Sequence, residues 1–105
     1  MKHINKIINK LNKSIKDLYS DFSGVYLYGS YANNTAVSDS DIDLIAIFAN
    51  SVERTRRMDL WDIVGKLEAE YDVIFDIHPM TLSELEKNSV YYNQVVNKGI
   101  FYGAK

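Results

Sequence analysis

The stretch GSYANNTAVSDSDIDL, residues 29–44, decides the predicted fold of this chain of 105 residues. It follows a short apolar run at 25–28 and leads into another at 42–48, so it predicts two strands joined by a polar loop. Gly29-Ser30 is typical of a tight turn, and we expect a helix to start there. Backbone N–H groups and a hydroxyl at such a turn suit phosphate oxygens, and a helix N-terminus adds a partial positive charge.

Two carboxylates lie near the end of this stretch. Asp41 and Asp43 are separated by one residue, so in a strand their side chains share one face with Cα atoms about 6–7 Å apart. Carboxylates this close repel each other and resist joint ionisation unless a cation lies between them. Mg²⁺ suits such a pair because it binds a few carboxylates, keeps some waters and fills its shell with substrate phosphates. Two such ions, about 3.5–4 Å apart, clamp the attacking and leaving oxygens of an in-line displacement.

A third carboxylate lies in a later apolar run. Residues 72–78 are rich in β-branched and aromatic side chains and predict a strand, with Asp76 in its middle. A buried Asp must be hydrogen-bonded, protonated or bound to a metal, because burying it unpaired is costly. If this strand lies beside 42–48, Asp76 faces Asp41 and Asp43 and completes a triad. These residues therefore predict an Mg²⁺ site for transferring a nucleotide from a nucleoside triphosphate.

Two long helices are expected around these strands. Apolar residues at helical spacing predict an amphipathic helix over the first twenty residues, ended by Gly24 and the short polar stretch before it. A second helix, residues 52–71, is expected to carry one apolar stripe, formed by Met58, Trp61, Val64, Leu67 and Tyr71.

The last third of the chain predicts shorter elements. Pro79 is expected to stop the third strand, and a capping box at 81–84 begins a short helix. A further helix over 90–98 ends at Gly99, before a short terminal strand at 100–102. The order of elements predicts one α/β domain, residues 1–105, with a small mixed β-sheet flanked by helices.

Composition excludes several function classes. The formal net charge of −2 gives no support for nucleic acid as a partner, and the absence of cysteine excludes disulfides and thiol chemistry. The longest apolar stretch, residues 44–49, is far too short to span a bilayer, and the first residues lack the pattern of a signal peptide. We therefore expect a cytoplasmic protein that does not bind membranes.

The motif residues together resemble the minimal nucleotidyltransferases of the DNA polymerase β-like superfamily. That family has Gly-Ser, a loop of about ten residues, Asp-x-Asp, and a third Asp on a neighbouring strand. Gly29-Ser30, Asp41-Ile42-Asp43 and Asp76 match it in order. Tyr31 and Asn33 stand where minimal members have arginines. Asn34 stands where they have a second glycine, a replacement that is tolerable because Asn adopts left-handed backbone angles more easily than most residues.

The resemblance implies a polymerase β-like nucleotidyltransferase fold and a role for each motif residue. Gly29 and Ser30 would hold the triphosphate of ATP. Asp41 and Asp43 would bind two Mg²⁺ ions, and Asp76 would bind the catalytic ion beside the attacking hydroxyl. These three carboxylates are thus both the catalytic and the metal-binding residues that the resemblance implies.

The resemblance also implies a reaction and a partner. It points to transfer of AMP from ATP onto a hydroxyl acceptor, as in antitoxins that adenylylate a tyrosine of a HEPN-domain toxin. Two alternatives stay open: the catalytic subunit of a two-protein enzyme acting on a small molecule, and a non-catalytic module that neutralises a partner by docking.

Other polar and aromatic residues receive plainer interpretations. Asp39 is expected to be a loop carboxylate, or at most an outer partner of the site, and His78 to make a local hydrogen bond. The cluster of Arg54, Arg56 and Arg57 is expected to form a solvated helix face. Four aromatic residues near the end of the chain are the candidates for a partner surface: Tyr91, Tyr92, Phe101 and Tyr102.

Overall fold

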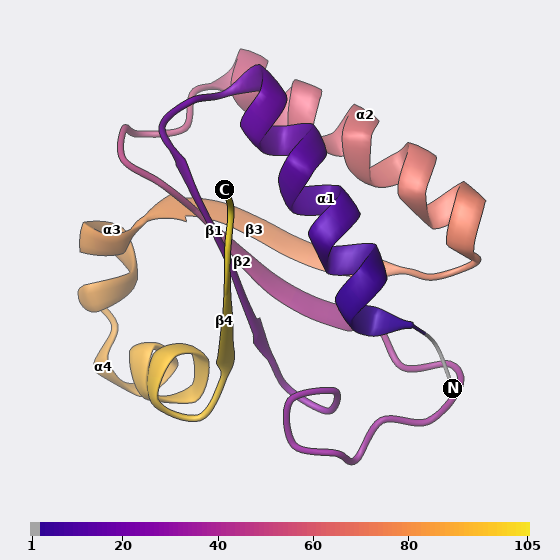
Figure 1. Ribbon diagram of the computed structural model, residues 1–105. Helices are drawn as coiled ribbons and strands as arrows, with labels where there is room; N and C mark the ends of the chain where they lie inside the picture. Colours follow the sequence, from indigo (N-terminus) through magenta and orange to yellow (C-terminus); the bar gives the residue numbers. More distant parts are fainter. Residues whose placement is uncertain (1–2) are drawn as a thin grey trace.

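The structure is a computed structural model that describes residues 3–105. Its helices and strands build one α/β fold (Figure 1). In chain order they are α1 (Ile4–Leu18), β1 (Phe22–Tyr28), β2 (Ile42–Phe48), α2 (Arg54–Tyr71), β3 (Phe75–Thr81), α3 (Leu82–Glu86), α4 (Ser89–Tyr92), the π-helix η1 (Asn93–Asn97) and β4 (Ile100–Gly103).

The four strands form one mixed sheet in the order β3-β2-β1-β4. β1 pairs antiparallel with both β2 and β4, whereas β2 and β3 are parallel because α2 carries the chain back across the sheet. This is the small mixed sheet with flanking helices that the sequence predicts. Among residues 3–105, no helix is long and apolar enough to cross a membrane.

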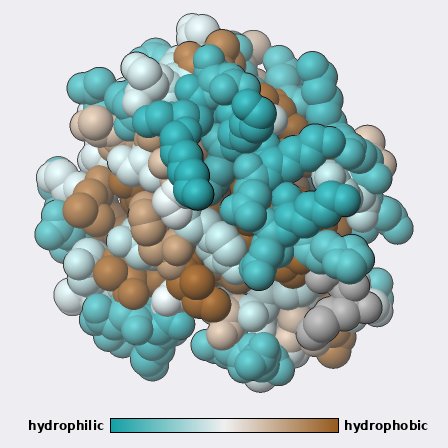
Figure 2. All heavy atoms as spheres, viewed as in Figure 1, coloured by the Kyte–Doolittle hydropathy of each residue, from teal (hydrophilic) through white to brown (hydrophobic). Residues whose placement is uncertain are grey.

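Helices cover the two faces of the sheet unequally. The long helices α1 and α2 pack on one face and close the larger hydrophobic core. The outward side of α1 carries lysine and asparagine and is seen in Figure 2 as a hydrophilic strip. The short segment from α3 to η1 covers part of the other face, where Leu85 and Val95 pack on Ile45 and Ile47. The second face is therefore only partly covered.

The inward face of α2 differs from the predicted stripe. Met58 and Trp61 are more than half exposed, and the buried residues of the helix are Leu60, Val64 and Leu67. Arg56 precedes Leu60 by one helical turn and is also turned inward.

Arg56 is an internal residue of the fold rather than part of a solvated face. Its guanidinium lies 2.7 Å from the Asp21 carboxylate, and the two side chains are 14% and 17% exposed. It also lies over the rings of Tyr19 and Phe48. The Arg56 ion pair therefore lies on the side of α2 that faces the sheet.

Pro79 and Gly24 do not end the elements that they were predicted to end. Pro79 does not stop β3, which continues to Thr81 with Pro79 paired to Ala46. Alternate residues of β3 hydrogen-bond to β2, and the carbonyl of Ile74 accepts such a bond from β2. Pro79 is an odd number of residues from Ile74, so its nitrogen faces the free edge of the sheet and no hydrogen bond between the strands is lost. Gly24 does not end α1, which stops at Leu18.

Gly24 instead lies inside β1 at a break in its register, with φ 142°. A Cβ there would collide with the backbone of β4, so the close approach of the two strands requires glycine. The expected helix over 90–98 is α4 followed by η1. The capping box at Thr81 and Glu84 is present as predicted.

Candidate active site

The sheet register places three polar side chains in a row. Tyr28 of β1 is paired with Asp43 of β2, and Asp43 is paired with Asp76 of β3. Because strand residues alternate between faces, this row lies on the partly covered face, where Tyr28 joins the smaller hydrophobic cluster. Asp43 and Asp76, far apart in sequence, are thus neighbours on one face.

The two carboxylates influence each other directly. Burial raises the pKa of Asp43, and the negative charges of Asp76 and then Asp41 raise it further. A hydrogen bond between the Asp43 and Asp76 carboxyl groups also contributes to the raised pKa of Asp43. The pair is therefore an electrostatically strained arrangement that a bound cation would relieve.

Asp76 differs in two ways from its predicted place. It is the second residue of β3 rather than the middle of a strand, and its side chain is 49% exposed. Solvent reaches the carboxylate, so the cost of burying an unpaired Asp does not arise. Its Oδ1 lies 2.9 Å from Nε2 of His78, so the histidine makes a close local contact with this carboxylate.

Asp41 stands just outside this pair. It is exposed and immediately precedes β2, close enough for its charge to raise the pKa of Asp43. Within residues 3–105, no group of three or more His, Cys, Asp or Glu side chains is gathered closely enough to hold a metal ion. The structure brings two carboxylates together and leaves the third at the edge.

The chemistry of this donor set still fits Mg²⁺. Mg²⁺ is commonly held by one or two carboxylates, with waters and substrate phosphates completing its shell, rather than by an all-protein cage. Asp43 and Asp76 supply two hard oxygen donors on a partly open face, and Asp41 adds negative charge beside them.

Gly29 lies directly against this carboxylate pair. It follows β1 with φ 72°, a left-handed conformation that favours glycine. A Cβ at this position would collide with Oδ2 of Asp43. Glycine is therefore required both by the backbone angle and by the close approach of the Asp43 side chain.

The turn after Gly29 does not open a helix. Residues 29–34 form a hydrogen-bonded turn, in which Asn33 N donates to Gly29 O at 3.1 Å and Thr35 N donates to Ser30 O at 2.9 Å. Asn34 adopts φ 59°, a left-handed geometry that Asn tolerates, and this reverses the chain. No helix dipole is thus available to a phosphate here, which leaves the Ser30 hydroxyl and the backbone of the turn as the candidate phosphate-binding groups.

A pair of tyrosines borders the carboxylates and was not predicted. The hydroxyls of Tyr28 and Tyr91 are 2.9 Å apart, and their rings meet edge to face at 5.8 Å. Burial raises the pKa of Tyr28, and the hydrogen bond between Tyr28 and Tyr91 and the charges of Asp43 and Asp76 raise it further. The contact joins residues 63 positions apart, so no local pattern could indicate it.

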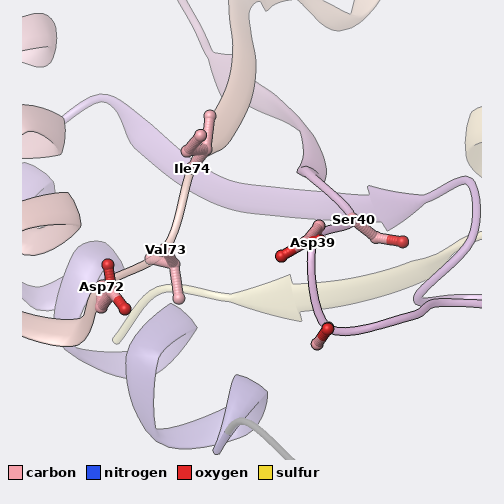
Figure 3. A pocket seen from close by; sticks show the side chains of 6 residues that line it. Asp39, Ser40, Asp72, Val73 and Ile74 are labelled. Atoms are coloured by element: carbon pink, nitrogen blue, oxygen red, sulfur yellow. The ribbon is translucent and has the colours of Figure 1, made fainter.

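Asp39 lies in the loop before β2, two residues ahead of Asp41. It lines a hollow of about 400 Å³ between the loop before β2 and the segment before β3. Figure 3 shows its carboxylate together with Asp72, Val73 and Ile74. Asp39 is an exposed loop residue, and none of the predicted site residues lines this hollow.

The terminal aromatic residues are mostly turned inward. Tyr91 and Tyr92 pack against the smaller cluster, and Tyr102 packs on the larger core with its hydroxyl 2.6 Å from Asn5 Oδ1. Phe101 is 47% exposed and lies on Tyr26. Figure 2 shows apolar atoms gathered near β4 and α4, where Val90 and Ile100 are also exposed.

Comparison with known proteins shows the family to which this chain belongs. The nucleotidyltransferase domain family matches residues 8–102, which is most of the chain. The chain therefore belongs to the nucleotidyltransferase domain family, as the resemblance in the Gly-Ser and Asp-x-Asp motifs predicted.

One named relative is similar to most of this chain. Protein adenylyltransferase MntA of Shewanella oneidensis is 29% identical over 91 residues, which are 87% of this chain and 60% of MntA. This chain thus spans less than two thirds of the length of that relative.

Two solved structures of complexes are similar to this fold. The crystal structure of a toxin–antitoxin with AMP-PNP has a TM-score of 0.63 and 29% identity, and the match covers 89% of this chain and 69% of that one. A structure of a tri-AMPylated HEPN toxin of Shewanella oneidensis in complex with an MNT antitoxin has a TM-score of 0.58 and 26% identity, with 92% and 69% covered.

Proposed function

We propose that this domain transfers the AMP group of ATP to a hydroxyl on a partner protein. The observation that carries the proposal is the Asp43–Asp76 pair, held side by side on a partly open face beneath the Gly29 turn. The similarity to a toxin–antitoxin complex that contains AMP-PNP supports a nucleoside triphosphate as the donor.

Each motif residue has a role in this proposal. The Ser30 hydroxyl and nearby backbone N–H groups bind the triphosphate. Gly29 gives the turn its left-handed backbone and lets the Asp43 carboxylate lie against it. Asp43 and Asp76 hold Mg²⁺ with help from the charge of Asp41, and a second ion binds with the nucleotide. Bound Mg²⁺ neutralises phosphate charge and lowers the pKa of the acceptor hydroxyl.

The proposed step is an in-line displacement. The acceptor oxygen forms a bond to the α-phosphorus, the bond from that phosphorus to the α–β bridging oxygen breaks, and pyrophosphate leaves. The hydroxyl proton passes to an oxygen of Asp76, which is half exposed and exchanges it with water. The products are an adenylylated acceptor and pyrophosphate.

We propose a tyrosine of a HEPN-domain toxin as the acceptor. The support is the similarity to MntA, named as a protein adenylyltransferase, and to a complex that contains an AMPylated HEPN toxin. The exposed apolar residues beside α4 and β4 offer a contact surface, with Val90 73% and Phe101 47% exposed.

Co-expression with the protein encoded beside this chain tests the proposal. The wild-type chain should protect cells, and the neighbour should gain the mass of one or more adenylyl groups. The Asp41→Asn/Asp43→Asn variant should lose both effects while still binding, whereas Asp39→Asn, a loop carboxylate outside the pair, should keep both.

Each other outcome has a definite meaning. Full protection without added mass would replace the enzymatic proposal with a docking module. Transfer of AMP to a small molecule but not to the neighbour would favour the catalytic subunit of a two-protein enzyme.

A further inference from the structure

One imidazole side chain beside the carboxylate pair has no part in the proposed transfer. His78 lies two residues after Asp76 on β3, so both side chains project from the same face. Its Nε2 is 2.9 Å from Oδ1 of Asp76, well within hydrogen-bond distance. The two side chains are 54% and 49% exposed, so this contact is made at the open rim of the site and not in the core.

The backbone holds His78 in place for this contact. Its cross-strand partner on β2 is Ile45, which is fully buried and anchors the smaller hydrophobic cluster. β3 continues through Pro79, which is a buried residue and whose φ is fixed by its ring. The imidazole therefore projects from a rigid stretch of strand, and its contact with Asp76 does not depend on a mobile loop.

We infer that His78 is a positioning residue that fixes the Asp76 carboxylate for cation binding in the proposed transfer site. By donating from Nε2 to Oδ1, it restrains rotation of the carboxylate and leaves Oδ2 to act as a ligand beside Asp43. A half-exposed Asp would otherwise sample several rotamers and lose that freedom on binding. The inference rests on the proposed function for its purpose, but its test does not need transfer to occur.

A merely structural role for His78 predicts something different. Because the side chain is more than half exposed, replacing it leaves no cavity, and the melting temperature should stay close to that of the wild type. Groups that hydrogen-bond to a metal ligand, in contrast, commonly change metal affinity about 10–100-fold when they are removed. The inference therefore separates cation affinity from stability.

Mn²⁺ binding to the metal-free chain, without nucleotide, is the direct test. Titration calorimetry or electron paramagnetic resonance would compare the wild type with His78→Leu, which keeps the bulk and loses the donor, and His78→Gln, which offers an amide N–H. His3→Gln is the matched control, because His3 is the other histidine of the chain and lies at the start of α1. Thermal unfolding of each variant measures stability.

The expected pattern is specific. His78→Leu should weaken Mn²⁺ binding about 10-fold or more, His78→Gln should restore it to within about 3-fold, and His3→Gln should match the wild type. The effect of His78→Leu should vanish in an Asp76→Asn background, since the two side chains act through one contact. All melting temperatures should remain close to that of the wild type.

Other results would overturn the inference. His78→Leu binding Mn²⁺ as tightly as the wild type would remove the positioning role. Equal weakening in the Leu and Gln variants would mean that the imidazole is itself a ligand. A wild-type chain that binds no Mn²⁺ would reject the inference outright. Normal Mn²⁺ results in a chain that transfers no AMP would instead reject the proposed function alone.

Discussion

The two faces of strand β2 show how one short segment serves both folding and chemistry. On the face beneath α1 and α2, Ile42, Leu44 and Phe48 are almost completely buried in the larger core. On the opposite face, the first side chain of β2 is that of Asp43, which is half buried. It is followed on that face by Ile45 and Ile47, which are buried. The fold is stabilised mainly on the first face, and this leaves the second free to hold a pair of repelling carboxylates.

The largest expected effect comes from the polar face. Asp43→Asn should lower AMP transfer by at least about 10²-fold, because it removes one of the two paired carboxylates and the charge that attracts a cation. Asp39→Asn, which changes an exposed loop carboxylate, is the control and should leave the rate unchanged. Measuring kcat for both variants with purified protein checks this. An Asp43→Asn variant with normal kcat would separate the carboxylate pair from catalysis.

The matching change on the apolar face should affect stability instead. Leu44→Ala is one residue along β2, at a fully buried position, and should cost about 2–5 kcal/mol of unfolding free energy. The fraction that stays folded should keep the wild-type KM for ATP. Val37→Ala, at a position 68% exposed, should change neither quantity. Urea unfolding combined with kinetics tests the separation, and a raised KM in folded Leu44→Ala would contradict it.

Two glycines sharpen the comparison at the edge of the site. Gly29→Ala should destabilise the protein by about 1–3 kcal/mol and lower transfer, because the backbone is left-handed and the new Cβ would push Asp43 aside. Gly65→Ala should stabilise it by about 0.5–1 kcal/mol, since Gly65 is helical with open space at the Cβ position. Thermal unfolding of both variants measures this, and equal effects at both positions would contradict the assigned role of Gly29.

The smallest expected effect is a pH dependence of stability. The pKa of Asp43 is raised in the folded chain, so this group binds its proton more tightly there than in the unfolded chain. Its contribution therefore leaves the protein most stable below the unfolded pKa and lowers stability as pH rises through the folded pKa. In EDTA at neutral pH, Asp43→Asn should be more stable than the wild type by about 0.2–1 kcal/mol.

Urea unfolding of both proteins between about pH 4 and pH 7 measures this difference, since the unfolded Asp pKa is about 3.9. The gain in the variant should shrink toward acid pH. A gain that grows toward acid pH would mean that Asp43 is stabilised by its charge, not strained by it.

Local signals predicted much of this molecule. The bounds of β2 follow from a compact apolar run at 42–48, and the capping box at 81–84 depends on residues three apart. The left-handed Asn34 follows from the tolerance of Asn for positive φ. The prediction that Asp43 and Asp76 share a face needed only strand alternation and the assumption that β2 and β3 are neighbours.

Long-range contacts decided the rest. Helical periodicity placed Val64 and Leu67 of α2 correctly in the core but wrongly added Met58 and Trp61. It did not indicate that Arg56 is turned inward, because its partner Asp21 is 35 residues away. Pro79 is tolerated only because β3 lies at the edge of the sheet. The residues around Pro79 do not indicate that β3 is an edge strand. The tyrosine pair beside the carboxylates likewise depends on α4 packing onto β1. In each case the outcome depends on tertiary packing that no local signal indicates.

The most direct test of the proposed chemistry follows two labels through one reaction. Purified chain, partner protein and Mg²⁺ are incubated with ATP labelled in the α-phosphate or in the γ-phosphate. The account predicts that the α label appears on the partner, that the γ label leaves as pyrophosphate, and that Asp43→Asn does neither. Appearance of the γ label on the partner would show phosphoryl transfer, and α labelling that survives Asp43→Asn would contradict a role for the carboxylate pair.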